Sequence, residues 1–143
     1  MSSVPPPQKK YSANCHCGLV RFSVTTPDVA LQKIVSCNCS ICTKNGYLFV
    51  YPRREDVVFV SAEAEAEMTS YRFGNGKKAH KFCPRCGTSV LIDFSEAERE
   101  VERAVTAVNI RTFVDIEEIM EDLQLKSVDG KNKLGPAYSV KNA

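Results

Sequence analysis

Short runs of alternating hydrophobic and polar residues follow one another along most of this chain, with turn residues between them. Val20, Phe22 and Val24 alternate with polar neighbours, which is the pattern of a strand with one buried face. Comparable runs cover residues 47–51, 57–61, 69–73, 79–82, 88–94 and 104–109. Because strand-like runs outnumber helical ones, the pattern predicts a mainly β fold.

One segment, 115–123, has a helical period instead, with Asp115 at the N-cap position. The apolar face of this segment is formed by Ile116, Ile119, Met120 and Leu123. Residues 96–103 mix acidic and basic side chains and predict an exposed loop or a short helical turn. We therefore expect a mainly β domain with one short helix near its C-terminal end.

The composition is that of an ordinary globular domain: 143 residues, 43% hydrophobic and 25% charged. Residues 1–10 contain three consecutive prolines and predict a flexible tail, which leaves 11–143 as the folded domain. We find no apolar run near the roughly 20 residues of a membrane helix, and no apolar core of a secretory signal at the N-terminus. A cytoplasmic location is expected, with a nuclear one also open.

Seven cysteines in three clusters carry the candidate chemistry. Cysteines one or two residues apart are poorly placed to form disulfides with each other, and an odd number leaves one thiol over. Thiolates at such spacings are typical of metal sites. The clusters are Cys15-His-Cys17-Gly, Cys37-Asn-Cys39-Ser-Ile-Cys42 and Cys83-Pro-Arg-Cys86-Gly. The natural division is one closed, structural site of four thiolates and one site of three thiolates with an open position.

The first and third clusters have the same form, because a glycine follows the second cysteine and a strand-like run comes next. Two such knuckles can face each other around one zinc ion. The predicted ligands of this closed site are Cys15, Cys17, Cys83 and Cys86. Two alternatives stay open: two buried pairs of inert thiols, or a zinc ribbon in which one cysteine of the middle cluster joins Cys83 and Cys86.

The middle cluster, Cys37, Cys39 and Cys42, can reach one ion from a single loop. Zinc in such a site holds an incoming thiol as its thiolate and polarises a neighbouring carbonyl. A fourth protein ligand would close the site instead. His16 alternates with two cysteines and is expected to point away from them. His80 is expected to be a partly exposed strand residue, with a place beside the open site as the alternative.

Several basic residues lie near the clusters and would suit an anionic substrate with two carboxylates. They are Lys44, Arg53, Arg54, Arg72, Lys77, Lys78, Lys81 and Arg85. The alternative is plain solvated surface. The formal charge of +2 falls to about −1 once thiolates and two zinc ions are counted, so basicity gives no argument for nucleic-acid binding.

Together, the three clusters resemble the glutathione-dependent formaldehyde-activating enzyme family, which also contains relatives of centromere protein V. The resemblance runs from about Tyr11 to Tyr138. It rests on Cys15-x-Cys17-Gly, Cys37-x-Cys39-x-x-Cys42-Thr and His80-Lys-Phe-Cys83-x-x-Cys86-Gly. Shorter matches are Lys44-Asn-Gly-Tyr, Tyr71-Arg-Phe-Gly, Ala107-Val-Asn-Ile-Arg111 and Asp129-Gly130.

The resemblance implies a zinc-stabilised β-tent domain with two zinc ions per chain. One ion would be structural, on Cys15, Cys17, Cys83 and Cys86, and the other catalytic, on Cys37, Cys39 and Cys42. The implied activity is a carbon–sulfur lyase that joins formaldehyde to glutathione, giving S-hydroxymethylglutathione, or that acts on a related aldehyde or thioether adduct. The competing hypotheses are a non-catalytic, protein-binding zinc module of the centromere protein V type and a thiol redox sensor.

Overall fold

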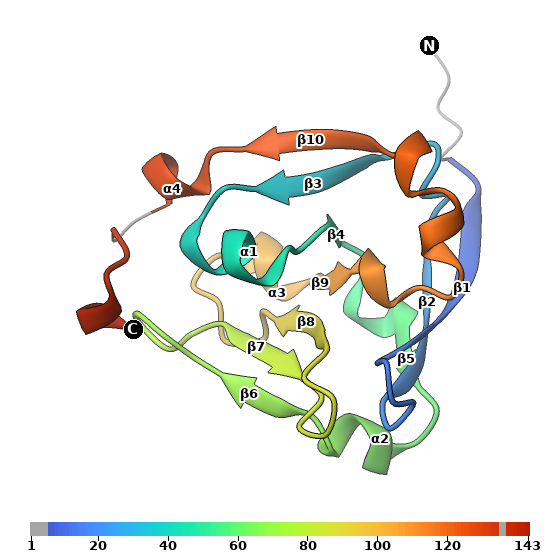
Figure 1. Ribbon diagram of the computed structural model, residues 1–143, viewed down its shortest axis with the longest axis horizontal. Helices are drawn as coiled ribbons and strands as arrows, with labels where there is room; N and C mark the ends of the chain where they lie inside the picture. Colours follow the sequence, from blue (N-terminus) through green and yellow to red (C-terminus); the bar gives the residue numbers. More distant parts are fainter. Residues whose placement is uncertain (1–5, 135–136) are drawn as a thin grey trace.

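The computed structural model describes residues 6–134 and 137–143, which form short strands linked by short helices (Figure 1). The strands are β1 (Gln8–Asn14), β2 (Arg21–Pro27), β3 (Lys33–Cys37), β4 (Phe49–Val50), β5 (Val57–Phe59), β6 (Thr69–Tyr71), β7 (Ala79–Phe82), β8 (Ser89–Asp93), β9 (Thr106–Asn109) and β10 (Gln124–Val128). The α-helices are α1 (Ser40–Asn45), α2 (Ala62–Ala66), α3 (Glu100–Arg103) and α4 (Gly130–Lys133). The 3-10 helices are η1 (Arg54–Asp56), η2 (Ile110–Thr112), η3 (Ile116–Glu118), η4 (Met120–Asp122) and η5 (Val140–Asn142).

The strands form two sheets. A 3-stranded sheet has the order β1-β2-β5, and a 7-stranded sheet has the order β10-β3-β4-β9-β8-β7-β6. Figure 1 shows the strands of the larger sheet following one another from top to bottom, with β1 and β2 on its right. The pair of β10 and β3 is parallel and sets Val128 opposite Cys37, whereas the other strand pairs in both sheets are antiparallel.

Two hydrophobic cores lie on opposite faces of the central strands β8 and β9. Leu91 pairs with Val108, and both belong to the larger core, which also contains Cys15 and Cys83. The next pair along, Ile92 and Ala107, belongs to the smaller core, which contains Cys42. Successive side chains of a strand point to opposite faces, so these strands are buried on both sides. The cysteines of the first and third clusters therefore pack in the larger core, and those of the middle cluster pack in the smaller core.

The mainly β fold predicted from the sequence is confirmed, and every predicted strand overlaps an observed one. Three strands were not predicted: β1, β3 and β10. The residues of these strands give no clear alternation of hydrophobic and polar side chains. Strand β10, for example, is exposed along almost its whole length. Strand β1 begins at Gln8, so residues 8–10 of the predicted tail are strand; residues 1–5 lie outside the described part of the chain.

The expected helix over 115–123 is instead two consecutive 3-10 turns, η3 and η4. Asp115 occupies the N-cap position of η3, as predicted, but it has a φ of 60° and its side chain makes no capping hydrogen bond. Ile116 of this segment is buried against the larger core, and Ile119, Met120 and Leu123 pack against it. Tertiary packing therefore keeps the predicted apolar residues on the core but not the predicted helix type. In the described residues, no helix is long and apolar enough to cross a membrane.

Candidate metal centres

The sulfur atoms of the cysteines gather in two groups. Within each group the Sγ atoms all lie within 4.8 Å of one another, and the groups are Cys15, Cys17, Cys83, Cys86 and Cys37, Cys39, Cys42. This is the division into four and three expected from the spacing. It differs from the zinc-ribbon alternative, because no cysteine of the middle cluster lies with Cys83 and Cys86 in these groups.

Two similar backbone turns present the four sulfurs of the first group. The N–H of Gly18 donates to the carbonyl oxygen of Cys15 at 3.1 Å, and the N–H of Gly87 donates to that of Cys83 at 2.8 Å. Gly18 and Gly87 have φ values of 82° and 79°, a conformation that favours glycine. One turn joins β1 to β2 in the smaller sheet, and the other joins β7 to β8 in the larger sheet. The four-cysteine group therefore connects the two sheets.

Hydrogen bonds from the protein surround these sulfurs. The backbone N–H of Val20 donates to the Sγ of Cys15 at 3.3 Å, and the Thr88 hydroxyl lies 3.2 Å from the Sγ of Cys86. Burial raises the pKa of the Cys83 thiol to about 11. Burial also raises the pKa of Cys86, but hydrogen bonds, those from Thr88 first, together outweigh it and bring the pKa down to about 5. The surroundings thus favour the neutral thiol at Cys83 and, at Cys86, the thiolate, which is the form that binds a metal.

Arg85 reaches across from the second turn to the first. Its Nε donates to the Sγ of Cys17 at 3.2 Å, and a terminal nitrogen donates to the Cys17 carbonyl oxygen at the same distance. The backbone N–H of Leu19, and after it this guanidinium, lower the pKa of the Cys17 thiol. A cation beside a four-thiolate site offsets part of the negative charge that the site gathers.

The three-cysteine group lies where a strand passes directly into a helix. Cys37 is the last residue of β3, Cys39 is the N-cap of α1, and Cys42 is a buried residue within α1. Gly46 is the C-cap that follows the helix, and its φ of 64° allows its N–H to donate to the Cys42 carbonyl oxygen. One compact turn therefore holds all three sulfurs, as a five-residue spacing from Cys37 to Cys42 requires.

The thiols of this group are unequal. Hydrogen bonds from Cys42, from its side chain first, lower the pKa of Cys39 to about 5 against the effect of burial. The pKa of Cys42 is raised by its hydrogen bond to Cys39 and by burial. In the described residues no further histidine, cysteine or carboxylate joins the three sulfurs. Sulfur donors of this kind suit zinc, and three of them leave one position of a tetrahedral ion for another ligand.

Both histidines lie outside these groups. His16 is exposed, and its backbone N–H donates to the Thr88 hydroxyl at 3.1 Å. His80 is buried, so the expectation of a partly exposed side chain is wrong. Its Nδ1 lies 3.3 Å from the hydroxyl of Tyr47, and burial lowers the pKa of the imidazole to about 4. The ring is therefore neutral near pH 7.

A row of aromatic rings runs from the three-cysteine group past this histidine. Tyr47 and Phe49 pack with Cys42 in the smaller core, and their ring centroids lie 4.5 Å apart. The row continues from Tyr47 to His80 at 6.0 Å and from His80 to Phe73 at 5.4 Å. Sequence alternation did not reveal this contact, because Tyr47 and His80 are 33 residues apart.

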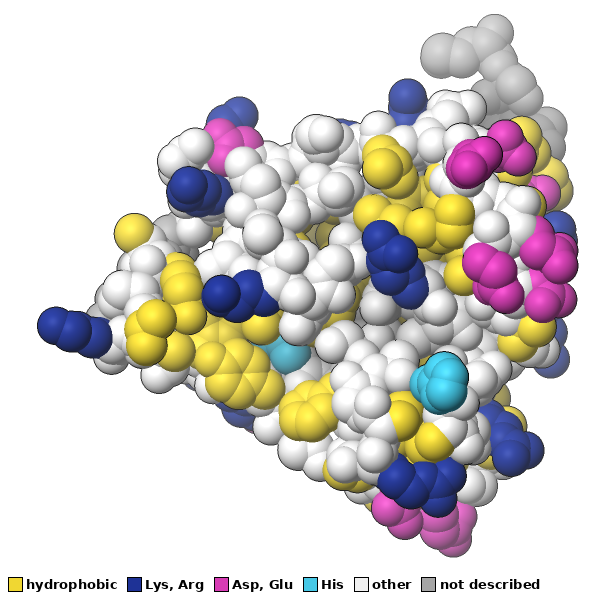
Figure 2. Space-filling view, in the orientation of Figure 1, with side chains coloured by type: hydrophobic (Ala, Val, Ile, Leu, Met, Phe, Trp, Pro, Cys, Tyr) yellow, Lys and Arg dark blue, Asp and Glu magenta, His cyan; other side chains and the backbone are white. Residues whose placement is uncertain are grey.

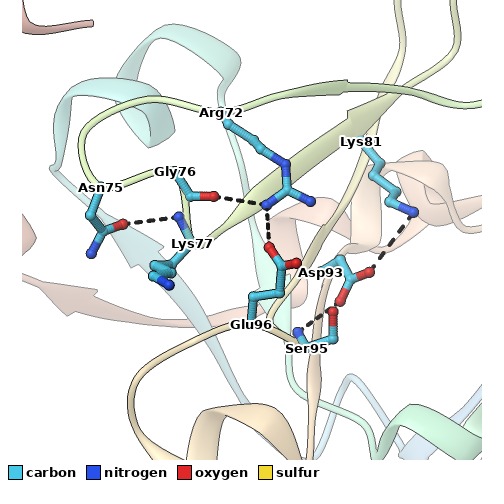
Figure 3. A network of polar contacts seen from close by, with 8 residues as sticks. All are labelled: Arg72, Asn75, Gly76, Lys77, Lys81, Asp93, Ser95 and Glu96. Atoms are coloured by element: carbon cyan, nitrogen blue, oxygen red, sulfur yellow. Dashed lines mark hydrogen bonds and ion pairs between the residues drawn. The ribbon is translucent and has the colours of Figure 1, made fainter.

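The hairpin that carries His80 is held by polar contacts at its outer end (Figure 3). Arg72 donates to the carbonyl oxygen of Gly76 and to the carboxylate of Glu96, both at 2.7 Å. Lys81 forms an ion pair with Asp93 at 3.8 Å on the neighbouring strand. These contacts keep the hairpin against the loop that follows β8.

The basic residues considered as substrate contacts are mostly engaged with protein groups. Arg53, Arg72, Lys78 and Lys81 form ion pairs with carboxylates, and Arg85 binds Cys17. Figure 2 shows Lys and Arg side chains scattered over the visible face rather than gathered in one patch. Lys44 lies in α1, two residues after Cys42. Arg111, which is not among these basic residues, donates to the carbonyl oxygen of Gly46 at 2.7 Å.

An open hollow lies beside the three-cysteine group. Its volume is about 390 Å³, and it is lined by Ser36, Cys37, Asn38, Ser127, Val128 and Asp129. The parallel pairing of β3 with β10 brings these two stretches together. Cys37 therefore borders a space that a small molecule can enter.

Comparison with known proteins agrees with this architecture. A crystal structure of a Rhodobacter sphaeroides protein superposes with a TM-score of 0.65 at 22% identity, covering 80% of this chain and 99% of that one. At this identity the likeness shows a shared fold. The model of the glutathione-dependent formaldehyde-activating enzyme family matches residues 10–126, which include all seven cysteines. With most of its length matched, this chain belongs to the glutathione-dependent formaldehyde-activating enzyme family.

Proposed function

We propose that the protein is a zinc-dependent carbon–sulfur lyase acting on glutathione adducts, such as S-hydroxymethylglutathione or the adduct of a larger aldehyde. The observation that carries the proposal is the three-cysteine group, which has three sulfurs within 4.8 Å and no fourth histidine, cysteine or carboxylate in the described chain. In this proposal Cys37, Cys39 and Cys42 hold the catalytic zinc. Cys15, Cys17, Cys83 and Cys86 hold a structural zinc that joins the sheets.

The proposed reaction is an addition of a thiol to a carbonyl and its reverse. In the synthetic direction the sulfur of glutathione bonds to the carbonyl carbon, the C=O double bond becomes single, and the thiol proton passes to the oxygen. The bound zinc would supply Lewis acidity and stabilise the thiolate. The polypeptide contributes the hollow beside Cys37 and the buried aromatic residues next to Cys42, which limit the access of water to one side.

Zinc stoichiometry on the purified protein, followed during titration with reduced glutathione, tests the proposal. We expect two zinc ions per chain, one of which changes its binding when glutathione is added. The variant Cys39→Ser should lose that ion and the response to glutathione, whereas Ser40→Ala, its neighbour in sequence, should keep both. One tightly held zinc without any response to glutathione would refute the proposal and favour the protein-binding module.

Activity is best measured at equilibrium, because thiol addition to formaldehyde also proceeds without a catalyst. Exchange NMR of glutathione with labelled formaldehyde gives the rate of adduct formation with and without the protein. We expect exchange to be faster with wild type than with Cys39→Ser. If wild type and Cys39→Ser give equal exchange rates with formaldehyde and with each of a series of larger aldehydes, the lyase assignment is refuted.

A further inference from the structure

Gly130 differs from the other glycines in the described residues. Five of these six glycines have a positive φ, and Gly130 is the exception. A Cβ added at Gly130 would lie 2.5 Å from the Sγ of Cys37 and 3.2 Å from the Cβ of Cys39. Close approach to the cysteine turn, and not backbone conformation, is therefore what requires glycine at this position.

Asn38, the residue between Cys37 and Cys39, binds the same segment by hydrogen bonds. Its Nδ2 donates to a carboxylate oxygen of Asp129 at 3.0 Å, and its Oδ1 accepts the backbone N–H of Lys131 at 2.9 Å. Its own backbone N–H donates to the carbonyl oxygen of Val128 at 3.1 Å. Three hydrogen bonds thus join one residue to the segment 128–131.

The segment 128–131 is itself well held. Strand β10 ends at Val128, which pairs with Cys37 in the parallel ladder. Asp129 is the N-cap of α4, and its carboxylate accepts the backbone N–H of Asn132 at 3.2 Å. The turn that carries the cysteines therefore rests on a strand end and a capped helix rather than on a free loop.

We propose that the segment 128–131 is a clasp that positions Cys37 and Cys39 for metal, so that Gly130 and Asn38 set the zinc affinity of the three-cysteine group alone. The inference rests on the proposed function in taking that group as a zinc site. Residues that orient metal ligands typically change metal affinity by 10–100-fold when they are replaced. The four-cysteine group belongs to the larger core, whereas Cys37, Cys39 and Cys42 belong to the smaller one.

The test is stepwise zinc removal from the zinc-loaded protein by a chelator, with zinc release followed by a coloured indicator. Cys39→Ser identifies which release step belongs to the three-cysteine group. The variant Gly130→Ala places a methyl group against the Cys37 sulfur. Because alanine favours a helix more than glycine does, this substitution does not weaken α4 through helix propensity. Lys131→Ala is the matched control, because it lies next in α4, is exposed and keeps the backbone N–H that binds Asn38.

We expect Gly130→Ala to release zinc from the three-cysteine group at a chelator concentration about tenfold lower than wild type. The other release step should not change, and Lys131→Ala should match wild type in both steps. Asn38→Ala, which removes the side-chain bonds without adding bulk, should shift the same step.

Release from Gly130→Ala and Asn38→Ala at the wild-type chelator concentration would overturn the clasp. A shift of both steps together would also overturn it, because it would show general damage to the fold. If wild type holds two zinc ions but ignores glutathione, the proposed function fails while the clasp stands. If wild type holds a single zinc ion, both fail.

Discussion

Arg85 of one turn and Cys17 of the other are joined by two hydrogen bonds, from Nε to Sγ and from a terminal nitrogen to the carbonyl oxygen, both at 3.2 Å. The two residues are 68 positions apart, in turns that belong to different sheets. The planar guanidinium suits this contact because it donates in two directions at once. One side chain thus aligns the two halves of the four-cysteine group.

Replacing Arg85 should weaken zinc retention at the four-cysteine group. We expect Arg85→Ala to lose that zinc about tenfold faster than wild type, because Cys17 loses both a cationic partner and an anchor. Arg85→Lys keeps the charge but not the two-directional geometry, so it should fall between the two. Zinc release into excess chelator provides the rates, and identical rates for all three proteins would contradict the role given to Arg85.

Cys83→Ser and Cys39→Ser should differ in their effect on stability. Cys83 belongs to a group that links residues 66 positions apart and two sheets, so its loss should lower the free energy of unfolding by about 2–5 kcal/mol. Cys39 belongs to a group whose three cysteines are close in sequence, so its loss breaks no long-range link and should lower stability much less. Urea unfolding of the zinc-loaded proteins measures both, and the reverse order would refute this division of roles.

Ile34 is fully buried in β3, the strand that ends at Cys37. The substitution Ile34→Ala should lower the free energy of unfolding by about 2–4 kcal/mol through lost burial and a cavity. Leu31→Ala is the matched control, since Leu31 is 70% exposed, and it should change stability by less than about 0.5 kcal/mol. Equal effects in urea unfolding would mean that β3 is not anchored as described.

His80 should make stability depend on pH in the acid range. Its pKa is lowered to about 4 by burial, against 6.5 as the usual value, so the unfolded chain binds a proton where the folded one does not. Stability from this residue is complete above pH 6.5 and is lost as pH falls through 4, by about 3 kcal/mol in all.

His80→Gln removes this titration and serves as its control. The unfolding free energies of wild type and His80→Gln are measured in urea at saturating zinc. As pH falls from 6.5 to 4, wild type should lose about 3 kcal/mol of stability relative to His80→Gln. Both proteins contain the same metal groups, so a loss of zinc at low pH affects both and cancels in the difference. A difference that is constant with pH would show that His80 is not desolvated in the folded protein.

The strands with a buried and an exposed face were predictable from the chain alone. In β2, Phe22, Val24 and Thr26 are buried and the residues between them are not, which is the alternation seen in the sequence. Strand β10 could not be found in this way, because it is an edge strand stabilised by pairing with β3 and its residues are exposed. The segment 115–123 kept its apolar residues on the core, but its helix type was set by packing.

The number of cysteines, their close spacing and the family to which they point can be read from the chain alone, because local spacing is a property of the chain. Which pairs of cysteines meet depends on tertiary packing, since the packing of two sheets brings the Sγ atoms of Cys17 and Cys83 to 3.7 Å from each other. The contacts of His80 with Tyr47 and of Gly130 with Cys37 likewise join distant positions. Such contacts depend on the register of strands and the meeting of faces, which no local pattern contains.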